Sequence, residues 1–258
     1  MLLMRLLRAA VLALLPLTLQ PPAALAQPAA APDALAVSRQ LGGWLGVDAL
    51  LEQTPFILGQ ALQAEAKLRG APTATQAQWR QTLAARTQPT ALRERMARQL
   101  AQALDVQVLQ QAAAVLDAPL ARRARYFDLA MTQPGAGLGF QAFRLESKNQ
   151  PTTAARRQLI KAIVDSNGDT LLLAQWQTTL SAEVERVASG QAPARRLQED
   201  AVRERMRFLA PRAEEYALYA YRYLTDAELQ TYLDQLRSAE VQQVLEVCRR
   251  NLAQALSD

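Results

Sequence analysis

Apolar residues recur every three or four positions along almost the whole chain, which is the spacing of one face of an α-helix. Two such stripes are Leu159, Ile160, Ile163 and Val164, and Leu229, Tyr232, Leu233 and Leu236. The intervening residues are mainly Ala, Gln, Arg and Glu, which favour helices. No segment alternates apolar and polar residues as a half-buried strand would. The pattern therefore predicts an all-α protein.

Glycine and proline mark the breaks between the predicted helices, as at Gly70 and Gly190. Between these breaks we expect helices at residues 34–46, 48–69, 74–87, 90–114, 118–131, 135–147, 152–165, 169–189, 194–222, 226–236 and 239–256. The start of a helix needs a side chain that accepts from its free backbone amides. We expect Asp48 and Asp169 to act as such N-caps, and Thr225 with Glu228 to form a capping box.

Short segments of the first half recur in the same order in the second half. The pairs are Arg39-Gln40-Leu41 with Arg157-Gln158-Leu159, Asp48-Ala49-Leu50-Leu51 with Asp169-Thr170-Leu171-Leu172, Arg93-Glu94-Arg95-Met96 with Arg203-Glu204-Arg205-Met206, and a segment around Phe127 with one around Tyr232. Collinear repetition predicts a duplicated unit. We therefore expect two related helical bundles in tandem, at residues 34–148 and 152–258, joined at 149–151.

The first 26 residues have the features of a secretory signal peptide. Arg5 and Arg8 precede a short apolar run that contains Pro16, and Ala24-Leu25-Ala26 offers small residues for cleavage. A membrane anchor is the alternative, but a span needs about 20 apolar residues. We expect cleavage after Ala26, a disordered Pro/Ala tail at 27–33, a periplasmic mature protein and no transmembrane segment in it.

Composition excludes several kinds of chemistry. The chain has no histidine, which removes histidine-based catalytic triads and histidine metal sites. Cys248 is the only cysteine, and its helical face is apolar, so we expect a buried thiol; pairing with a partner protein is the alternative. Loss of Arg5 and Arg8 lowers the net charge by two, from +5 to +3, and nucleic acid is not an expected partner.

Two short motifs resemble ligand-binding loops. Residues 135–139 read Gly-Ala-Gly-Leu-Gly, but a dinucleotide loop follows a strand, so we expect a turn between helices. Residues 165–169 resemble the start of a calcium loop, but its later positions hold Thr170 and Trp176 where glycine and glutamate are needed. We expect no metal and no cofactor, with a weak cation site at 165–169 as the alternative.

The segment Leu224-Thr225-Asp226-Ala227-Glu228-Leu229-Gln230-Thr231-Tyr232-Leu233, with Ser238 after it, resembles the bacterial exported family called domain of unknown function 2059. Tyr126-Phe127 and Thr132-Gln133-Pro134-Gly135 resemble the later part of the same signature. Ala239-Glu240-Val241 departs from the family's Pro-x-Gly. The resemblance implies export and an all-helical unit, and it brings no catalytic residues.

Tyr216, Tyr219 and Tyr223 share a helical face, which is interpreted as a core stripe or, with Trp176, as the wall of a ligand groove between the two units. Two arginine clusters, Arg122-Arg123-Arg125 and Arg249-Arg250, are interpreted as solvated faces that allow weak membrane-surface contact. With no catalytic residue assigned, we expect a non-enzymatic scaffold that binds an unknown envelope protein. The alternatives are a carrier of an apolar or lipid ligand in that groove and a hydrolase that uses only carboxylates.

Overall fold

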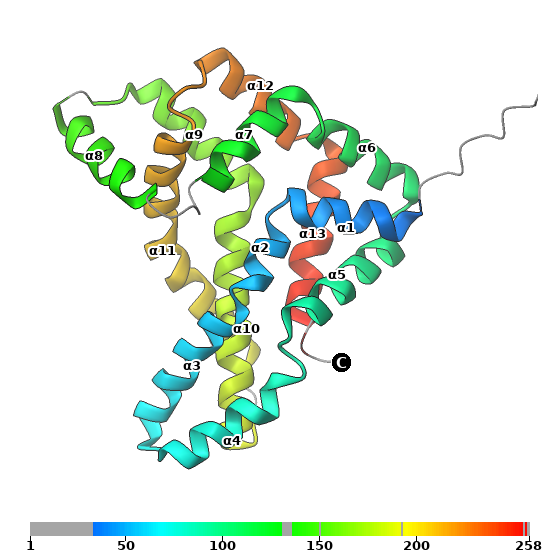
Figure 1. Ribbon diagram of the computed structural model, residues 1–258, viewed down its shortest axis with the longest axis vertical. Helices are drawn as coiled ribbons and strands as arrows, with labels where there is room; N and C mark the ends of the chain where they lie inside the picture. The colour runs from blue at the N-terminus through cyan, green and yellow to red at the C-terminus, as the bar shows by residue number, and fades with distance from the viewer. Residues whose placement is uncertain (1–32, 131–135, 150, 192, 255, 257–258) are drawn as a thin grey trace, which may run out of the picture. The chain divides into compact units, whose positions relative to one another are not determined.

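The computed structural model describes residues 33–130, 136–149, 151–191, 193–254 and 256. The predicted signal peptide and residues 27–32 of the predicted tail lie outside the described residues. The prediction is wrong for Asp33, because its carboxylate accepts from the backbone N–H of Leu35 at 3.1 Å and caps the first helix. The regular elements of the described part are all α-helices, so the predicted fold class is confirmed (Figure 1). None of these helices is both long enough and apolar enough to cross a membrane.

The helices follow one another with short connections. In the first half they are α1 (Ala34–Trp44), α2 (Val47–Glu52), α3 (Thr54–Arg69), α4 (Thr73–Ala84), α5 (Pro89–Ala103), α6 (Val106–Leu116), α7 (Pro119–Ala130) and α8 (Ala136–Asn149). In the second half they are α9 (Ala154–Asn167), α10 (Asp169–Ser189), α11 (Arg195–Ala220), α12 (Asp226–Leu236) and α13 (Ala239–Gln254).

Two of the predicted helices are wrong, because each is divided by a local start signal. The predicted helix 48–69 comprises α2 and α3, which separate at Gln53, and Pro55 lies in the first turn of α3. The predicted helix 90–114 comprises α5 and most of α6. The Asp105 carboxylate accepts from the backbone N–H of Gln107 at 2.8 Å and caps α6.

Other local predictions have clear outcomes. The capping box of Thr225 and Glu228 is confirmed at the start of α12. The turn predicted at residues 135–139 is wrong for its described part, because residues 136–139 form the first turn of α8. Gly135 lies outside the described residues.

The two halves begin with the same arrangement of a helix, a left-handed glycine and a second helix. Gly46 and Gly168 have φ angles of 71° and 74°, a conformation that glycine adopts without strain. Their carbonyl oxygens accept from Leu50 N at 3.0 Å and Leu172 N at 2.9 Å. Counted onward from each glycine, buried residues coincide at Leu50 and Leu172, Leu58 and Leu180, and Leu62 and Val184.

A second match runs through α6 and α7 of the first half and α12 and α13 of the second half. Helices α6 and α12 have 11 residues each and are capped by Asp105 and Thr225. The same count places Leu109 with Leu229, and Leu116 with Leu236, and all four are buried. By the same count, α7 and α13 begin at equivalent positions, Pro119 and Ala239. This register differs from the one given by the pairs of identical short segments. Such identities are common in helices rich in Ala, Leu and Arg, so they do not identify equivalent positions here.

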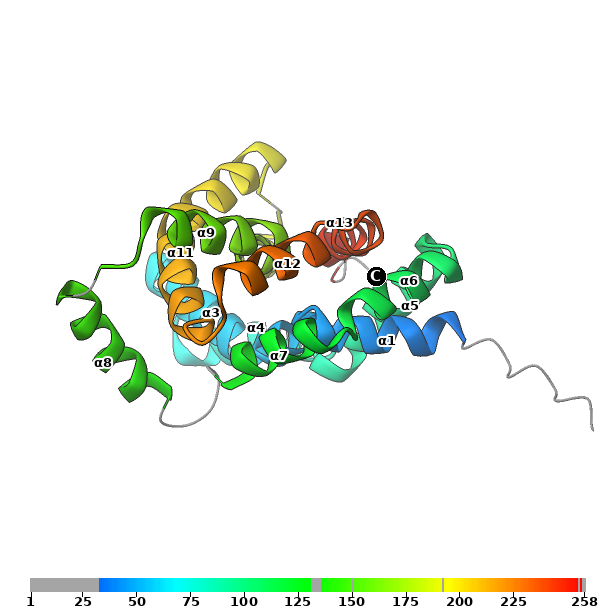
Figure 2. The ribbon, with the colours of Figure 1, turned by 90° about the horizontal axis from the view of Figure 1, so that it is seen from above.

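Helix α7 of the first half and helix α13 of the second half each pack against the other half. Helix α13 contacts α5 and α6, and α7 contacts α11 and α12 (Figures 1 and 2). Helix α10 also packs along α3. Residues 32–258 consequently form one compact unit with one hydrophobic core. Two separate tandem bundles, joined at 149–151, are therefore not confirmed.

Candidate functional site

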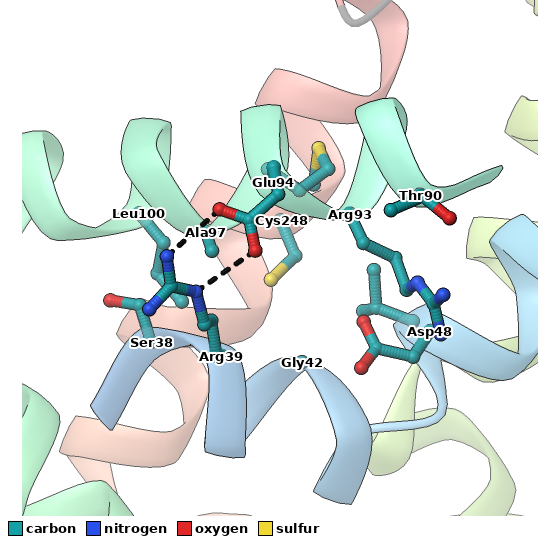
Figure 3. A pocket seen from close by; sticks show the side chains of 12 residues that line it. Ser38, Arg39, Gly42, Asp48, Thr90, Arg93, Glu94, Ala97, Leu100 and Cys248 are labelled. Carbon is teal, nitrogen blue, oxygen red and sulfur yellow. Dashed lines mark hydrogen bonds and ion pairs between the residues drawn. The ribbon is translucent and has the colours of Figure 1, made fainter. Parts of the chain in front are cut away.

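A first cavity, of about 230 Å³, lies between α1, α2, α5 and α13 (Figure 3). Across it, the guanidinium of Arg39 on α1 donates two hydrogen bonds of 2.9 Å to the Glu94 carboxylate on α5. Arg93, also on the cavity wall, donates to Glu52 at 2.8 Å. Arg39, Glu94 and Arg93 are thus paired within the protein, which leaves these three groups little capacity for a ligand, whereas Asp48 on the same wall forms no ion pair among the described residues.

The inner part of this first cavity holds Cys248. Its side chain is 2% exposed, so the predicted buried thiol is confirmed. Burial raises the pKa of Cys248 to about 12, which keeps the thiol neutral and unreactive near neutral pH. We interpret the first cavity as a structural gap beside an inert cysteine.

A second cavity, of about 280 Å³, lies between elements of the two halves, and we call it the seam cavity. The first half contributes α1, α2, α6 and α7, and the second half contributes α10 and α12 with the end of α9. Its wall is mainly apolar and includes Trp44, Leu45, Leu50, Leu116, Ala121, Leu172, Leu173 and Leu236. Its ionisable groups are Arg125, Asp128, Asp169 and Tyr232.

Asp128 enters the seam cavity from α7. The hydroxyl of Tyr221 donates a hydrogen bond of 2.9 Å to one oxygen of its carboxylate. Burial raises the pKa of Asp128 to about 7, although the hydrogen bond from Tyr221 opposes the rise. The carboxyl therefore exchanges its proton near neutral pH, which is a feature of binding and catalytic sites.

Asp169 enters from the first turn of α10, and the prediction that it is the N-cap is wrong. Gly168 occupies the N-cap position, and the Asp169 carboxylate accepts from the Asn167 side-chain amide at 3.1 Å. Asp48 likewise lies within the first turn of α2, where Gly46 is the N-cap. Asp169 lines the cavity and is itself exposed to solvent. The surrounding protein and the charge of Asp128 both raise its pKa.

Arg125 is the cation of the seam cavity, so its interpretation as part of a solvated face is wrong. Its guanidinium lies over the Trp44 ring at 4.8 Å and donates to the Leu116 carbonyl at 3.3 Å. Burial lowers its pKa. Arg122 and Arg123 are exposed as predicted.

The other arginine cluster divides in the same way. Arg249 is half-buried and forms an ion pair of 3.3 Å with Glu246. Arg250 is exposed, as predicted. The predicted solvated face at residues 249–250 is therefore formed by Arg250 and only the outer part of Arg249.

Comparison of the two halves shows that the polar groups of the seam cavity have apolar residues at the equivalent positions of the other half. Counted from the two glycines, Asp169 corresponds to Val47. Counted from the caps Asp105 and Thr225, three further residues of the cavity have apolar counterparts. These pairs are Arg125 with Leu245, Asp128 with Cys248, and Tyr232 with Ala112, and all four apolar counterparts are buried. The same helix packing therefore forms with apolar residues at these positions, which favours a functional role for the polar set.

The four residues of the predicted aromatic groove do not line the seam cavity. Trp176 is fully buried in the core. Tyr216 stacks on Phe140 of α8 with ring centroids 4.3 Å apart, and Tyr219 contacts the same ring at 5.7 Å. Tyr223 is 69% exposed. The described structure thus brings Tyr216 and Tyr219 together at α8 and keeps Trp176 apart from solvent.

Sequence reasoning missed Asp128, Asp169 and Arg125 as a group. The residues lie on two helices that are distant in the chain, and no motif links them. One signal was available: alignment of the halves on their caps places Asp128 opposite Cys248 and Arg125 opposite Leu245. Replacement of an apolar residue by a charged one at equivalent helix positions indicates a change of role.

Comparisons with protein-family models, with curated proteins and with solved structures found no match to this chain. The resemblance to domain of unknown function 2059 therefore stays a prediction. The functional argument rests on the seam cavity itself.

Proposed function

We propose that this protein is an exported binding protein of the cell envelope that holds a small amphipathic molecule in the seam cavity. The observation that carries the proposal is that two carboxyl groups from different helices, Asp128 and Asp169, line one mainly apolar cavity. Apolar walls with a few convergent polar groups are typical of small-molecule sites. The open seam favours the carrier over the scaffold that we expected from the sequence.

Export is the second part of the proposal, and it rests on the first 26 residues. Their charge, apolar run and small residues at 24 and 26 support cleavage after Ala26. Amino-terminal sequencing of the protein from an envelope fraction tests this part, with Gln27 as the expected first residue. A chain that still begins at Met1 in the cytosolic fraction would contradict export.

The binding test is native mass spectrometry of the protein purified from its own envelope fraction, followed by identification of any bound molecule. A cavity-blocking variant, Ala49→Trp, places an indole at the wall of the seam cavity. Ala64→Trp is the matched control, because Ala64 is exposed on α3 away from the described cavities. We expect an adduct on the wild type and on Ala64→Trp, and none on Ala49→Trp. An equal adduct on all three proteins would place binding elsewhere.

A hydrolase that uses only carboxylates is a second candidate, and one observation favours it. Asp128 and Asp169 come from different helices, and the charge of Asp128 raises the pKa of Asp169. Two coupled acids lose their protons in separate steps, so one is protonated while the other is ionised, as acid–base catalysis requires. The test is hydrolysis of chromogenic glycosides by the wild type, Asp128→Asn and Asp169→Asn. Hydrolysis by the wild type that both variants lose would favour the hydrolase over the carrier.

A further inference from the structure

We propose that the ligand of the seam cavity is an amphipathic organic cation, an amine with an apolar chain, whose ammonium group is bound by Asp128 and Asp169. This inference rests on the proposed binding function and specifies its ligand class. It follows from the hydrogen bonding of the two carboxylates, the charge balance of the cavity and the nature of its walls.

Both carboxylates have unused capacity to accept hydrogen bonds. Asp128 accepts from the Tyr221 hydroxyl, and Asp169 accepts from the Asn167 amide. Neither forms an ion pair with a cation among the described residues, whereas Glu94 and Glu228 pair with Arg39 and Arg123. A carboxylate has about four lone-pair positions, so each can accept further N–H donors. An ammonium group supplies three such donors.

The charge balance of the cavity favours a cation over an anion. Arg125 carries the positive charge on the wall, and Asp128 and Asp169 together carry two negative charges when both are ionised. Arg125 is held over Trp44 and bonded to the Leu116 carbonyl, so it does not neutralise either carboxylate by direct contact. One bound monocation makes the site neutral. A carboxylate ligand would instead face two carboxylates.

The walls of the cavity determine the rest of the ligand. Leu50 and Leu116 of the first half face the same space as Leu172 and Leu236 of the second half. An apolar chain that covers these side chains is removed from water, which strengthens binding by about fourfold for each buried methylene group. A small hydrophilic cation would leave this surface unused, so the structure favours an amine with an alkyl or aryl chain.

The ionisable groups around the carboxylates determine how binding depends on pH. Helix α7 contributes Arg125 and Asp128, and α10 contributes Asp169. Tyr221, which follows α11, and Tyr232 of α12 remain neutral because burial raises their pKa values. The lining residues from α1, α2, α6 and α9 carry no charged side chain. Because the pKa of Asp128 is raised to about 7 and that of Asp169 is raised as well, the two carboxyl groups hold more protons at pH 6 than at pH 8.

A cation that binds to this pair favours its ionised form and so releases protons that the pair holds. Affinity for the cation is then expected to rise with pH, by at most about tenfold per pH unit for one proton released. A neutral ligand would show no such rise, and an anionic ligand would bind more weakly as the carboxylates ionise. The sign of the pH dependence thus separates the three ligand classes.

The experiment is isothermal titration calorimetry of the purified protein with n-octylammonium, 1-octanol and octanoate, which share one chain and differ in head group. Titrations at pH 6 and pH 8, each in two buffers of different ionisation enthalpy, count the protons released. We expect octylammonium to bind more tightly than octanol and octanoate, to bind more tightly at pH 8 than at pH 6, and to release protons into the buffer.

Three variants identify the groups that bind the cation. Asp128→Asn and Asp169→Asn are each expected to reduce the affinity for octylammonium by about tenfold or more, because each removes one charge-assisted contact. Each should also reduce the number of protons released. Asp234→Asn is the control, because Asp234 is exposed on α12 and does not line the seam cavity. It should leave both quantities unchanged. The wild-type pH and buffer measurements test the proposal even if a variant does not fold.

The outcomes separate this inference from the proposed function. If octanol or octanoate binds as tightly as octylammonium, and Ala49→Trp blocks that binding, the cation proposal is overturned but the seam-cavity carrier stands. No binding of any probe, together with no adduct in native mass spectrometry, would overturn both. If octylammonium binds without proton release, the role of the carboxyl pair is overturned. The same holds if Asp128→Asn and Asp169→Asn both keep the full affinity.

Discussion

The indole nitrogen of Trp176 donates a hydrogen bond of 3.1 Å to the hydroxyl oxygen of Thr54 inside the core. Trp176 lies on α10 and Thr54 begins α3, and both are fully buried. Counted from Gly168 and Gly46, the two residues occupy corresponding positions, so this bond joins the halves of the protein at equivalent points. Equivalent helices that pack on each other explain why the halves share one core.

Loss of this acceptor should destabilise the protein measurably. Thr54→Val keeps the shape of the side chain but leaves the Trp176 N–H buried without a partner, which costs about 1–3 kcal/mol. Urea unfolding followed by tryptophan fluorescence measures the change. Thr231→Val is the control, because Thr231 is exposed on α12, and there we expect a change within about 0.5 kcal/mol. Equal effects of the two substitutions would contradict the role assigned to the bond.

The raised pKa of Asp128 predicts how stability varies with pH. This pKa is about 7 in the folded protein and about 3.9 in an unfolded chain. At pH values between these two pKa values, the folded protein holds a proton that the unfolded chain has released. The contribution of Asp128 to the free energy of unfolding therefore falls as pH rises. Relative to Asp128→Asn, the free energy of unfolding of the wild type should fall between pH 4 and pH 7, by at most about 1.4 kcal/mol per unit.

Urea unfolding of both proteins at intervals of one pH unit measures this difference directly. Carboxylates that form ion pairs elsewhere, such as Glu228, titrate in both proteins and cancel in the comparison. A difference that is constant across this range, or that grows with pH, would show that the pKa of Asp128 is not raised.

The correspondence of Asp128 with Cys248 predicts different effects on stability when each residue is replaced by the other. Cys248→Asp buries a carboxyl group among Val244, Leu245 and Leu252, beside an Arg249 that already pairs with Glu246. We expect it to destabilise the protein by at least about 2 kcal/mol at pH 8, and by less at pH 5, where the acid is protonated. Cys248→Ala measures the cost of lost packing alone and should show no such pH dependence.

Asp128→Cys should not destabilise the protein. It gives α7 the residue that α13 carries at the corresponding position, and it removes a carboxylate that lacks an ion pair. We expect no loss of stability at pH 8 and loss of cation binding in the seam cavity. A large loss of stability in thermal unfolding would instead assign Asp128 a structural role through its bond with Tyr221.

The burial of Cys248 predicts slow chemical modification. A thiol that is 2% exposed and has a pKa of about 12 presents almost no thiolate near pH 8. Labelling with a chromogenic disulfide reagent should be slower in the native protein than in urea by about a hundredfold or more. Labelling at the same rate in both states would show that α13 exposes this residue.

Much of the local structure of this protein could be predicted from its sequence. The helix at 226–236 and its capping box depend on contacts between residues three or four positions apart, such as Thr225 and Glu228. The burial of Cys248 followed from the apolar residues that share its face of the helix. The division between α5 and α6 was missed because Ala, Gln and Leu on both sides favour one continuous helix, and the cap at Asp105 decides otherwise.

By itself, then, the sequence determined the all-helical class and most helix boundaries, because propensity, capping and apolar spacing act within a few residues. Only the tertiary structure decided that α7 and α13 pack against opposite halves. That packing brings Asp128 and Asp169 to one cavity and turns Arg125 toward Trp44. The pKa values of the two carboxyl groups are raised by protein atoms that come from several distant segments, so no single segment of the chain predicts them.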